Sequence, residues 1–341
     1  MASDFHGGEI KEKIEYDFSV NTNPLGMPDY VKQAILENTD MFCTYPDRLC
    51  KELRECIAKY EHIEDSQILC GNGASELIMS ICASVSVEHE INALVSAPTF
   101  SGYERAIKAY GGNVSYYRNV DELINKISNG EYNLLFICNP NNPTGEVIDG
   151  LYIQKIIDIA GEKNILVVID ECFIDFTHEE SLVRHINEYG NLIVIKAFTK
   201  FYSMAGIRLG YLCSQNVICE KIKKFLAEWN VSNIAQLAGI SAYSDIDKVN
   251  RWKNKTLKLI DEERAYLISK LSEMGFEVSD SKANYIMLKS RKYDLWNELR
   301  SHGILVRDCQ NFNGLDNSYI RICISNHKNN EILINALNKL V

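Results

Sequence analysis

Apolar runs of strand length alternate with segments of helical periodicity through most of the chain before residue 240. The runs are rich in Val, Ile and Leu and cover residues 91–98, 133–140, 165–171, 191–198 and 208–214. The segments with apolar residues at helical spacing include 30–38, 48–60, 101–111 and 150–162. A strand that is buried on both faces has a continuous apolar run, because crossover helices cover its sheet on each side. The alternation therefore predicts βαβ units and an α/β fold with a mostly parallel sheet.

The pattern changes in the last part of the chain. A long amphipathic helix is predicted at about 245–275, and the tail after it has a βαβ-like pattern with a helix at 293–302. At the other end, an irregular arm reaches NTNPLG (21–26), which is rich in turn formers. We expect three parts, which are an N-terminal arm at 1–28, a large domain at 29–240 and a smaller α/β C-terminal domain at 241–341. The arm is expected to pack near the small domain.

Composition and charge exclude several classes of protein. The chain has 341 residues, a formal net charge of −10 and 46% apolar residues, which is typical of a globular protein. An acidic chain disfavours nucleic-acid and anionic-membrane binding, since both need a basic face. No apolar run approaches the roughly 18 residues of a membrane span, and the N-terminus has no apolar signal segment. These features predict a cytoplasmic protein without a nucleic-acid or membrane partner.

The cysteines agree with this compartment. The chain has 11 of them, scattered and without a CxxC pair, so neither a zinc site nor a disulfide framework is predicted. Most lie in apolar runs such as LLFICNP (134–140), where a reduced thiol packs as a small core residue. We therefore expect no metal site.

Polar groups follow the predicted strands at the point where each strand ends. Asp170 follows one apolar run, Lys200 follows the next with Arg208 eight residues after it, and NPNNPTG (139–145) follows an earlier one. Taken singly, an Asp after a strand is usually a helix cap and a lone Lys is usually solvated. In open α/β sheets, however, ligands bind beyond the carboxyl ends of the strands. The ordered set therefore predicts a ligand site at this edge of the sheet.

This ordered set resembles the fold-type-I pyridoxal-phosphate enzymes over nearly the whole chain. The matching segments are GNGASE (71–76), APTF (97–100), NPNNPTG (139–145), VVIDECF (167–173) and AFTKFYSMAGIRLGY (197–211). The resemblance implies a large domain with a seven-stranded sheet flanked by helices, a smaller C-terminal domain and pyridoxal 5'-phosphate as cofactor. It implies that Asp170 pairs with the ring nitrogen, that Lys200 holds the cofactor as a Schiff base, and that Arg208 clamps the phosphate.

The same resemblance assigns the other cofactor contacts. Ala74 and Ser75 match backbone donors to the phosphate at a helix N-terminus. Phe100 matches the aromatic residue stacked on the ring, and Asn142 matches the donor to the ring 3-oxygen. Tyr45 matches a tyrosine that reaches the phosphate in the neighbouring subunit, which implies a homodimer with shared active sites.

Within this superfamily the chain resembles the histidinol-phosphate aminotransferases and, more closely, the threonine-phosphate decarboxylases of cobalamin biosynthesis. The segments that carry this are HGG (6–8), DFSVNTNPLGMP (17–28), TKFYSMAGIRLGY (199–211) and ILVRDCQNFNGLDNSYIRICIS (304–325). Phe173 stands where the aminotransferases usually carry Tyr, although a neutral exchange in the pocket wall is the alternative.

Two positions depart from the family pattern. Ala197 replaces a Ser or Thr that bonds the cofactor phosphate, which leaves Thr199 as the nearest hydroxyl. Ala205 stands where the decarboxylases usually have Pro.

Four residues are candidates for substrate binding. Arg321 matches the arginine that grips the substrate α-carboxylate, for which a planar guanidinium is well suited. Arg307 matches a second arginine that holds a substrate phosphate, and the alternative is a surface salt bridge with Asp308 or Asp316. The remaining candidates for the phosphate are His6, acting across the dimer, and Asn21. A terminal histidine without a role is the alternative for His6.

Three functions are compatible with these residues. The first is decarboxylation of L-threonine O-3-phosphate to aminopropanol phosphate. The second is an aminotransferase of the histidinol-phosphate or aromatic amino acid type that uses 2-oxoglutarate. Both use the same residues and differ in which bond at Cα is aligned for cleavage, so the sequence favours the first without excluding the second. The third is a non-catalytic regulator, which is disfavoured because no DNA-binding domain accompanies the enzyme-like chain.

Overall fold

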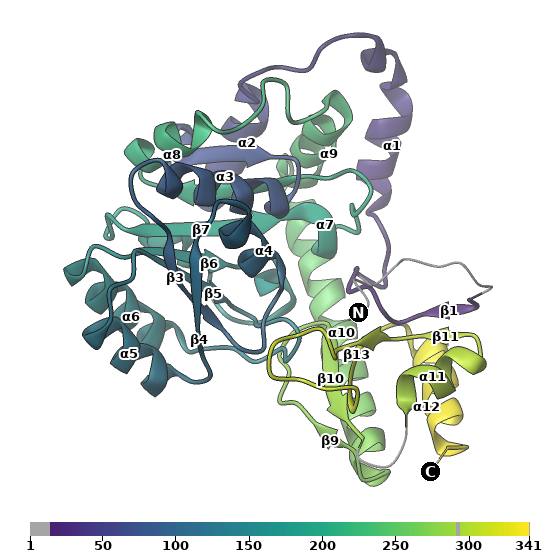
Figure 1. Cartoon of the computed structure of the whole chain (residues 1–341). Coiled ribbons are helices and arrows are strands. Elements are labelled where there is room, and N and C mark those ends of the chain that lie inside the picture. Colours follow the sequence, from purple (N-terminus) through teal and green to yellow (C-terminus); the bar gives the residue numbers. More distant parts are fainter. Residues whose placement is uncertain (1–13, 291–293, 341) are drawn as a thin grey trace.

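The computed structural model describes residues 14–290 and 294–340 and has a seven-stranded sheet at its centre (Figure 1). Its strands lie in the order β2-β8-β7-β6-β5-β3-β4. Their bounds are β2 (Ile68–Gly71), β3 (Asn92–Ser96), β4 (Asn113–Tyr117), β5 (Leu134–Cys138), β6 (Leu166–Asp170), β7 (Leu192–Ala197) and β8 (Gly210–Ser214). The four pairs from β4 to β7 are parallel, whereas β8 runs antiparallel to both β2 and β7. The predicted α/β fold with a mostly parallel sheet is confirmed.

Helices cover both faces of this sheet. Their bounds are α1 (Asp29–Glu37), α2 (Lys51–Glu61), α3 (Ala74–Ser86), α4 (Gly102–Ala109), α5 (Val120–Asn129), α6 (Gly150–Glu162), α7 (Phe198–Phe201), α8 (Asn216–Lys223) and α9 (Asn233–Tyr243). Short 3-10 helices are η1 (Thr39–Cys43), η2 (Asp65–Gln67), η3 (Ile174–Phe176) and η4 (Leu182–His185). Along β7, Leu192 and Val194 belong to one apolar core, and Ile193 and Ile195 belong to the other. Both faces of the strand are therefore buried, which explains its continuous apolar run.

The C-terminal unit begins with the long helix α10 (Ile246–Glu273) and contains a four-stranded antiparallel sheet. Its remaining elements are β9 (Glu277–Val278), β10 (Tyr285–Lys289), α11 (Leu295–Ser301), β12 (Arg307–Asp308), β13 (Tyr319–Cys323) and α12 (His327–Asn338). The tail expected to be βαβ-like is a split version of that unit, because β13 lies between β10 and β12 and runs antiparallel to both. Strand order depends on packing between distant segments, which local periodicity does not specify.

The N-terminal arm connects this unit to the large sheet. Strand β1 (Tyr16–Asp17) pairs in parallel with β11 (Ile304–Leu305), as Figure 1 shows beside α11. Further along the arm, the backbone N–H of Asn23 donates to the Lys200 carbonyl over 2.9 Å. The side-chain Nδ2 of Asn23 donates to the Phe201 carbonyl over 2.9 Å. The arm therefore packs on the C-terminal unit, as expected, and also holds the turn that carries Lys200. In the part of the chain that the structure describes, no helix is long and apolar enough to span a bilayer.

Candidate active site

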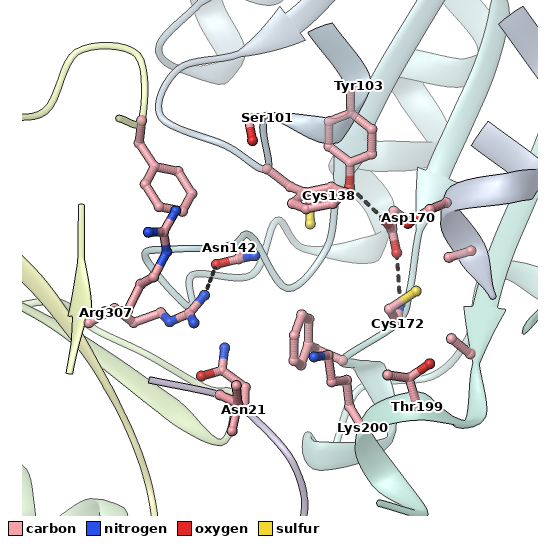
Figure 2. Close-up of a pocket in the computed structure, with 18 of the residues that line it drawn as sticks. Asn21, Ser101, Tyr103, Cys138, Asn142, Asp170, Cys172, Thr199, Lys200 and Arg307 are labelled. Atoms are coloured by element: carbon pink, nitrogen blue, oxygen red, sulfur yellow. Dashed lines mark hydrogen bonds between the residues drawn. The ribbon is translucent and has the colours of Figure 1, made fainter. Parts of the chain in front are cut away.

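A cavity of about 240 Å³ lies between the carboxyl ends of strands β3, β5, β6 and β7 and the C-terminal unit. Figure 2 shows Asn21 and Arg307 across this cavity from Asp170 and Lys200. On the side of the large sheet it is lined by Ala74, Ser75, Phe100, Ser101, Tyr103, Cys138, Asn142, Asp170, Cys172, Phe173, Ala197, Thr199, Lys200 and Arg208. The arm and the C-terminal unit contribute Ser19, Val20, Asn21, Arg307, Phe312 and Arg321. The cavity thus lies where the strand-end pattern placed a ligand site.

Asp170 is the last residue of β6, so the strand directs its carboxylate to the floor of the cavity. The carboxylate is buried and accepts two hydrogen bonds. The Tyr103 hydroxyl donates to Oδ2 over 2.6 Å, and the backbone N–H of Cys172 donates to Oδ1 over 3.0 Å. One donor on each oxygen fixes the orientation of the carboxylate and leaves acceptor capacity on both oxygens.

Lys200 lies on the short helix α7, directly after strand β7. Burial, together with the positive charges of Arg321 and Arg208, lowers the pKa of the Lys200 amine to about 8. With this pKa, roughly a tenth of the amine is neutral at pH 7 and about half at pH 8, and the neutral amine is the form that attacks a carbonyl carbon.

An anion-binding cradle forms where α3 begins. Gly73 caps the helix with a φ of +79°, and a Cβ at this position would lie only 2.6 Å from Nη2 of Arg208. Residue 73 must therefore be glycine for the guanidinium to lie against the helix N-terminus. The free N–H groups of the first helical turn, at Ala74 and Ser75, and the Arg208 charge suit a phosphate group. Thr199 lines the same cavity.

Arg321 crosses the opposite wall from the middle of β13. Its side chain is 6% exposed, Nη2 donates to the Ser19 carbonyl over 2.8 Å, and Nη1 donates to Oδ1 of Asn142. Its Nε has no hydrogen-bond partner among the described residues, and none of their carboxylates lies within ion-pair distance. Burying a guanidinium without a counter-ion is unfavourable. The geometry therefore suits an anionic ligand, such as a carboxylate.

Arg307 stands directly opposite Arg321 in the β12–β13 register. It is 7% exposed, donates from Nη2 to Oδ1 of Asn311 over 2.9 Å, and lies over the Phe312 ring at 5.3 Å. Because it is buried and lines the cavity, the alternative of a surface salt bridge is disfavoured. Two guanidinium groups from paired strands thus face one cavity, where an anionic ligand offsets their repulsion.

Aromatic side chains form the apolar walls. Phe100 follows β3, and Phe173 contacts the Tyr285 ring edge-on at 4.9 Å. The sequence reasoning missed Tyr103, Cys138, Cys172, Ser19 and Phe312 as lining residues. For Tyr103 a signal was available, since it lies one helical turn after Phe100.

Two predicted site residues are not in this cavity. Tyr45 is 82% exposed and packs against the Trp229 ring at 5.2 Å. Its position is compatible with a role in a neighbouring subunit, although it contributes nothing to the cavity of its own chain. His6 lies outside the described residues.

The donor set fits a phosphorylated pyridine aldehyde. Arg208 and the N-terminus of α3 suit its phosphate, the Lys200 amine suits its aldehyde, and the Asp170 carboxylate suits a protonated ring nitrogen. Phe100 and Phe173 supply apolar walls for the ring, and Asn142, which belongs to the NPNNPTG turn, supplies a polar side chain. Residues of these kinds would hold pyridoxal 5'-phosphate, whose protonated ring supplies an electron sink.

Comparison with known proteins agrees with this geometry. The family model "Aminotransferase class I and II" matches residues 13–337. The chain is 32% identical to the threonine-phosphate decarboxylase of Salmonella typhimurium over 98% of this chain and 96% of that protein. The crystal structure of the histidinol-phosphate aminotransferase from Clostridium acetobutylicum is also 32% identical, with a TM-score of 0.87 over 95% of this chain and 98% of that chain.

A third relative holds the cofactor. The crystal structure of histidinol-phosphate aminotransferase from Sinorhizobium meliloti in complex with pyridoxal-5'-phosphate has the same fold, with a TM-score of 0.87 at 20% identity. It covers 97% of this chain, and this chain covers 92% of it. The protein therefore belongs to the class I and II aminotransferase family, and its cofactor is pyridoxal 5'-phosphate.

Proposed function

We propose that this enzyme decarboxylates L-threonine O-3-phosphate to aminopropanol phosphate. The observation that carries the proposal is the pair of buried arginines, Arg307 and Arg321, which face one cavity from paired strands. A small substrate with both a carboxylate and a phosphate presents one anionic group to each guanidinium. Histidinol phosphate has a phosphate but no carboxylate, so it would leave Arg321 without a counter-ion.

The chain's own residues have separate roles in this reaction. When bound, the protonated cofactor ring accepts the electron pair that decarboxylation leaves at Cα. Asp170 holds the proton on the ring nitrogen, Arg321 grips the carboxylate, and Arg307 grips the phosphate. Lys200 would hold the cofactor aldehyde through its Nζ, and once the substrate is bound the same amine would deliver a proton to the carbon that has lost CO2.

Two further observations support a decarboxylase. Phe173 stands where the resemblance places a Tyr in the aminotransferases. It offers no hydroxyl to the ring 3-oxygen, so Asn142 is the candidate donor to that atom. The relative from Salmonella typhimurium carries the name threonine-phosphate decarboxylase and aligns over nearly the whole chain.

The second candidate is an aminotransferase that takes histidinol phosphate and 2-oxoglutarate. The equally similar Clostridium acetobutylicum structure favours it. In that reaction Arg321 would bind the carboxylate of the keto acid or of the glutamate formed from it, and Arg307 would bind the phosphate of the amine.

A pair of assays separates the two reactions. Purified enzyme loaded with pyridoxal 5'-phosphate is given L-threonine O-3-phosphate, and CO2 and aminopropanol phosphate are measured. The same preparation is given histidinol phosphate with 2-oxoglutarate, and glutamate is measured. The proposal expects product in the first assay and at most a trace in the second. Glutamate without CO2 would establish the aminotransferase instead.

We further propose a homodimer in which Tyr45 binds the cofactor phosphate of the partner subunit. Tyr45 and Phe42 are 82% and 55% exposed, and exposed aromatic side chains in one region are typical of an interface. Subunits with Lys200→Ala and subunits with Tyr45→Phe are mixed and allowed to exchange. One site of each heterodimer is then intact, so activity should partly return. A fully active monomer in sedimentation would refute the shared site.

A further inference from the structure

Tyr103 is a buried polar side chain to which the reaction outlined above gives no role. It lies in the first turn of α4 and has no exposed surface. Its hydroxyl donates to Oδ2 of Asp170 over 2.6 Å, and Figure 2 shows the ring directed at this carboxylate. Burial and the negative charge of Asp170 hold the pKa of the Tyr103 hydroxyl well above its usual value. The hydroxyl therefore remains protonated and is a donor throughout the physiological range.

The Tyr103 ring is held on two sides. It stacks on Phe136 of β5 with centroids 4.9 Å apart and an interplanar angle of 14°, and it meets Phe100 edge-on at 5.5 Å. Packing of this kind restricts an aromatic ring to one orientation. The hydroxyl is therefore fixed relative to the end of β6 and does not depend on a mobile side chain.

The turn that carries Tyr103 also places Phe100. A Cβ at Gly102 would lie 2.2 Å from Cε1 of Phe100, so residue 102 must be glycine for the ring to occupy this position. Residues 100–103, Phe-Ser-Gly-Tyr, thus position two groups expected to contact the cofactor ring. Phe100 would pack on the face of the ring, and Tyr103 orients Asp170, which would contact the ring nitrogen.

We propose that Tyr103 is a positioning residue for the cofactor, whose hydroxyl fixes Asp170 in the orientation that receives the protonated ring nitrogen. The second donor is the Cys172 N–H on Oδ1, at 3.0 Å, so each carboxylate oxygen has one fixed donor. Both oxygens keep acceptor capacity for a donor in the cavity. This inference concerns the cofactor and not the substrate, so it stands or falls independently of the proposed decarboxylation.

The test compares two cofactors in the Tyr103→Phe variant. Cofactor-free protein is titrated with pyridoxal 5'-phosphate and with its 1-deaza analogue, in which carbon replaces the ring nitrogen, and both dissociation constants are measured by absorbance. The wild type should prefer the natural cofactor, because only this ring donates a hydrogen bond to Asp170. Loss of a hydrogen bond to a charged group should reduce that preference by roughly ten- to a hundredfold.

A purely structural role predicts a different result. Lost packing would weaken both cofactors equally and leave their ratio unchanged. Tyr117→Phe is the matched control, because Tyr117 is also buried in this sheet and its hydroxyl donates to the Phe136 carbonyl at 3.3 Å. Melting temperatures verify that both variants fold. A preference in Tyr103→Phe that equals or exceeds that of the wild type would overturn the proposal.

Discussion

The half of the cavity on the large sheet is built from strand ends, whereas the half on the C-terminal unit is assembled from segments far apart in the chain. Asp170 and Lys200 follow adjacent parallel strands, so the sheet brings them together directly. Asn21 comes from the arm, and Arg307 and Arg321 come from paired strands of a different sheet. The first half needs only the correct sheet, and the second half also needs the arm and the C-terminal unit to pack against it.

The two halves also differ in how their polar atoms are satisfied. On the sheet side, Asp170 has protein donors on both carboxylate oxygens. On the other side, Oδ1 of Asn21 and Nε of Arg321 are buried without hydrogen-bond partners among the described residues. An unsatisfied buried polar group is costly, and a bound ligand, water or ion is one way to satisfy it. Under the proposed function, the sheet half is preorganised for the cofactor, and a substrate completes the other half.

Removing the Lys200 amine should have the largest effect. Lys200→Ala should abolish covalent attachment of the cofactor and its absorbance near about 420 nm, and it should lower turnover by roughly a thousandfold or more. Borohydride reduction followed by mass spectrometry measures the attachment. The matched control is Lys221→Ala, because Lys221 is exposed and its loss should not affect the cavity. Lys196→Ala is unsuitable, because Lys196 is buried in an ion pair with Glu61. Cofactor covalently attached in Lys200→Ala would assign the amine to another residue.

Neutralising Asp170 should have the next largest effect. Asp170→Asn preserves the size of the side chain but removes the negative charge that stabilises a protonated ring nitrogen. We expect the variant to retain its cofactor and to lose activity by roughly a hundredfold, the scale of one preorganised electrostatic contact. Steady-state kinetics at saturating cofactor measure this loss. Wild-type kcat would remove Asp170 from its role.

The two arginines should respond differently to substrate charge. Arg307→Leu should weaken phosphorylated substrates by roughly 2–4 kcal/mol and should change unphosphorylated analogues little, since these do not use the contact. Arg321→Leu should weaken L-threonine and L-threonine O-3-phosphate alike, because both carry the α-carboxylate. Each variant serves as the control for the other. A phosphate preference that survives Arg307→Leu would show that the phosphate binds elsewhere.

The smallest effect is a pH dependence that links the two halves. The neutral Lys200 amine captures the cofactor aldehyde, so the capture rate should rise with pH and level off above the pKa of about 8. The positive charge of Arg321 contributes to that low pKa, so Arg321→Gln should move the midpoint upward. Stopped-flow absorbance of cofactor-free protein mixed with pyridoxal 5'-phosphate measures the rate. A midpoint near 10.5, the ordinary lysine value, would refute the environment described for this amine.

The lowered pKa of Lys200 should also affect how the stability of the protein depends on pH. Between about 8 and 10.5 the folded protein without cofactor binds fewer protons at Lys200 than the unfolded chain does. The contribution of Lys200 to the free energy of unfolding therefore increases with pH across this interval. Denaturant titrations of the wild type and Lys200→Met at several pH values isolate that contribution. A free energy of unfolding of the wild type that falls relative to that of Lys200→Met as the pH rises would contradict it.

The sheet half was predictable from local sequence, because burial on both faces leaves a direct trace. The apolar runs at 165–171 and 191–198 became β6 and β7, with Asp170 and Lys200 at or just beyond their ends. The pairing order of the C-terminal strands was not predictable in this way. It depends on β13 entering between β10 and β12, which is decided by packing between distant segments.

Close approaches and long-range hydrogen bonds were also not predictable from local sequence, because they too depend on packing between distant segments. Gly73 and Gly102 are constrained by the side chains of Arg208 and Phe100, and nothing in the glycines themselves reveals this. The hydrogen bond from Tyr103 to Asp170 joins residues 67 positions apart. The family resemblance predicted many of the residues that line the cavity. The contacts that hold these residues in place are seen only in the structure.

The most direct test of the central claim asks which bond at Cα is broken. The enzyme is incubated with L-threonine O-3-phosphate in D2O without a keto acid, and the substrate and products are followed by NMR and mass spectrometry. A decarboxylase produces CO2 and aminopropanol phosphate with one deuterium on the carbon that carried the carboxylate. Exchange of the Cα proton for deuterium with the carboxylate retained and no CO2 released is the behaviour of an aminotransferase, and it would contradict the account.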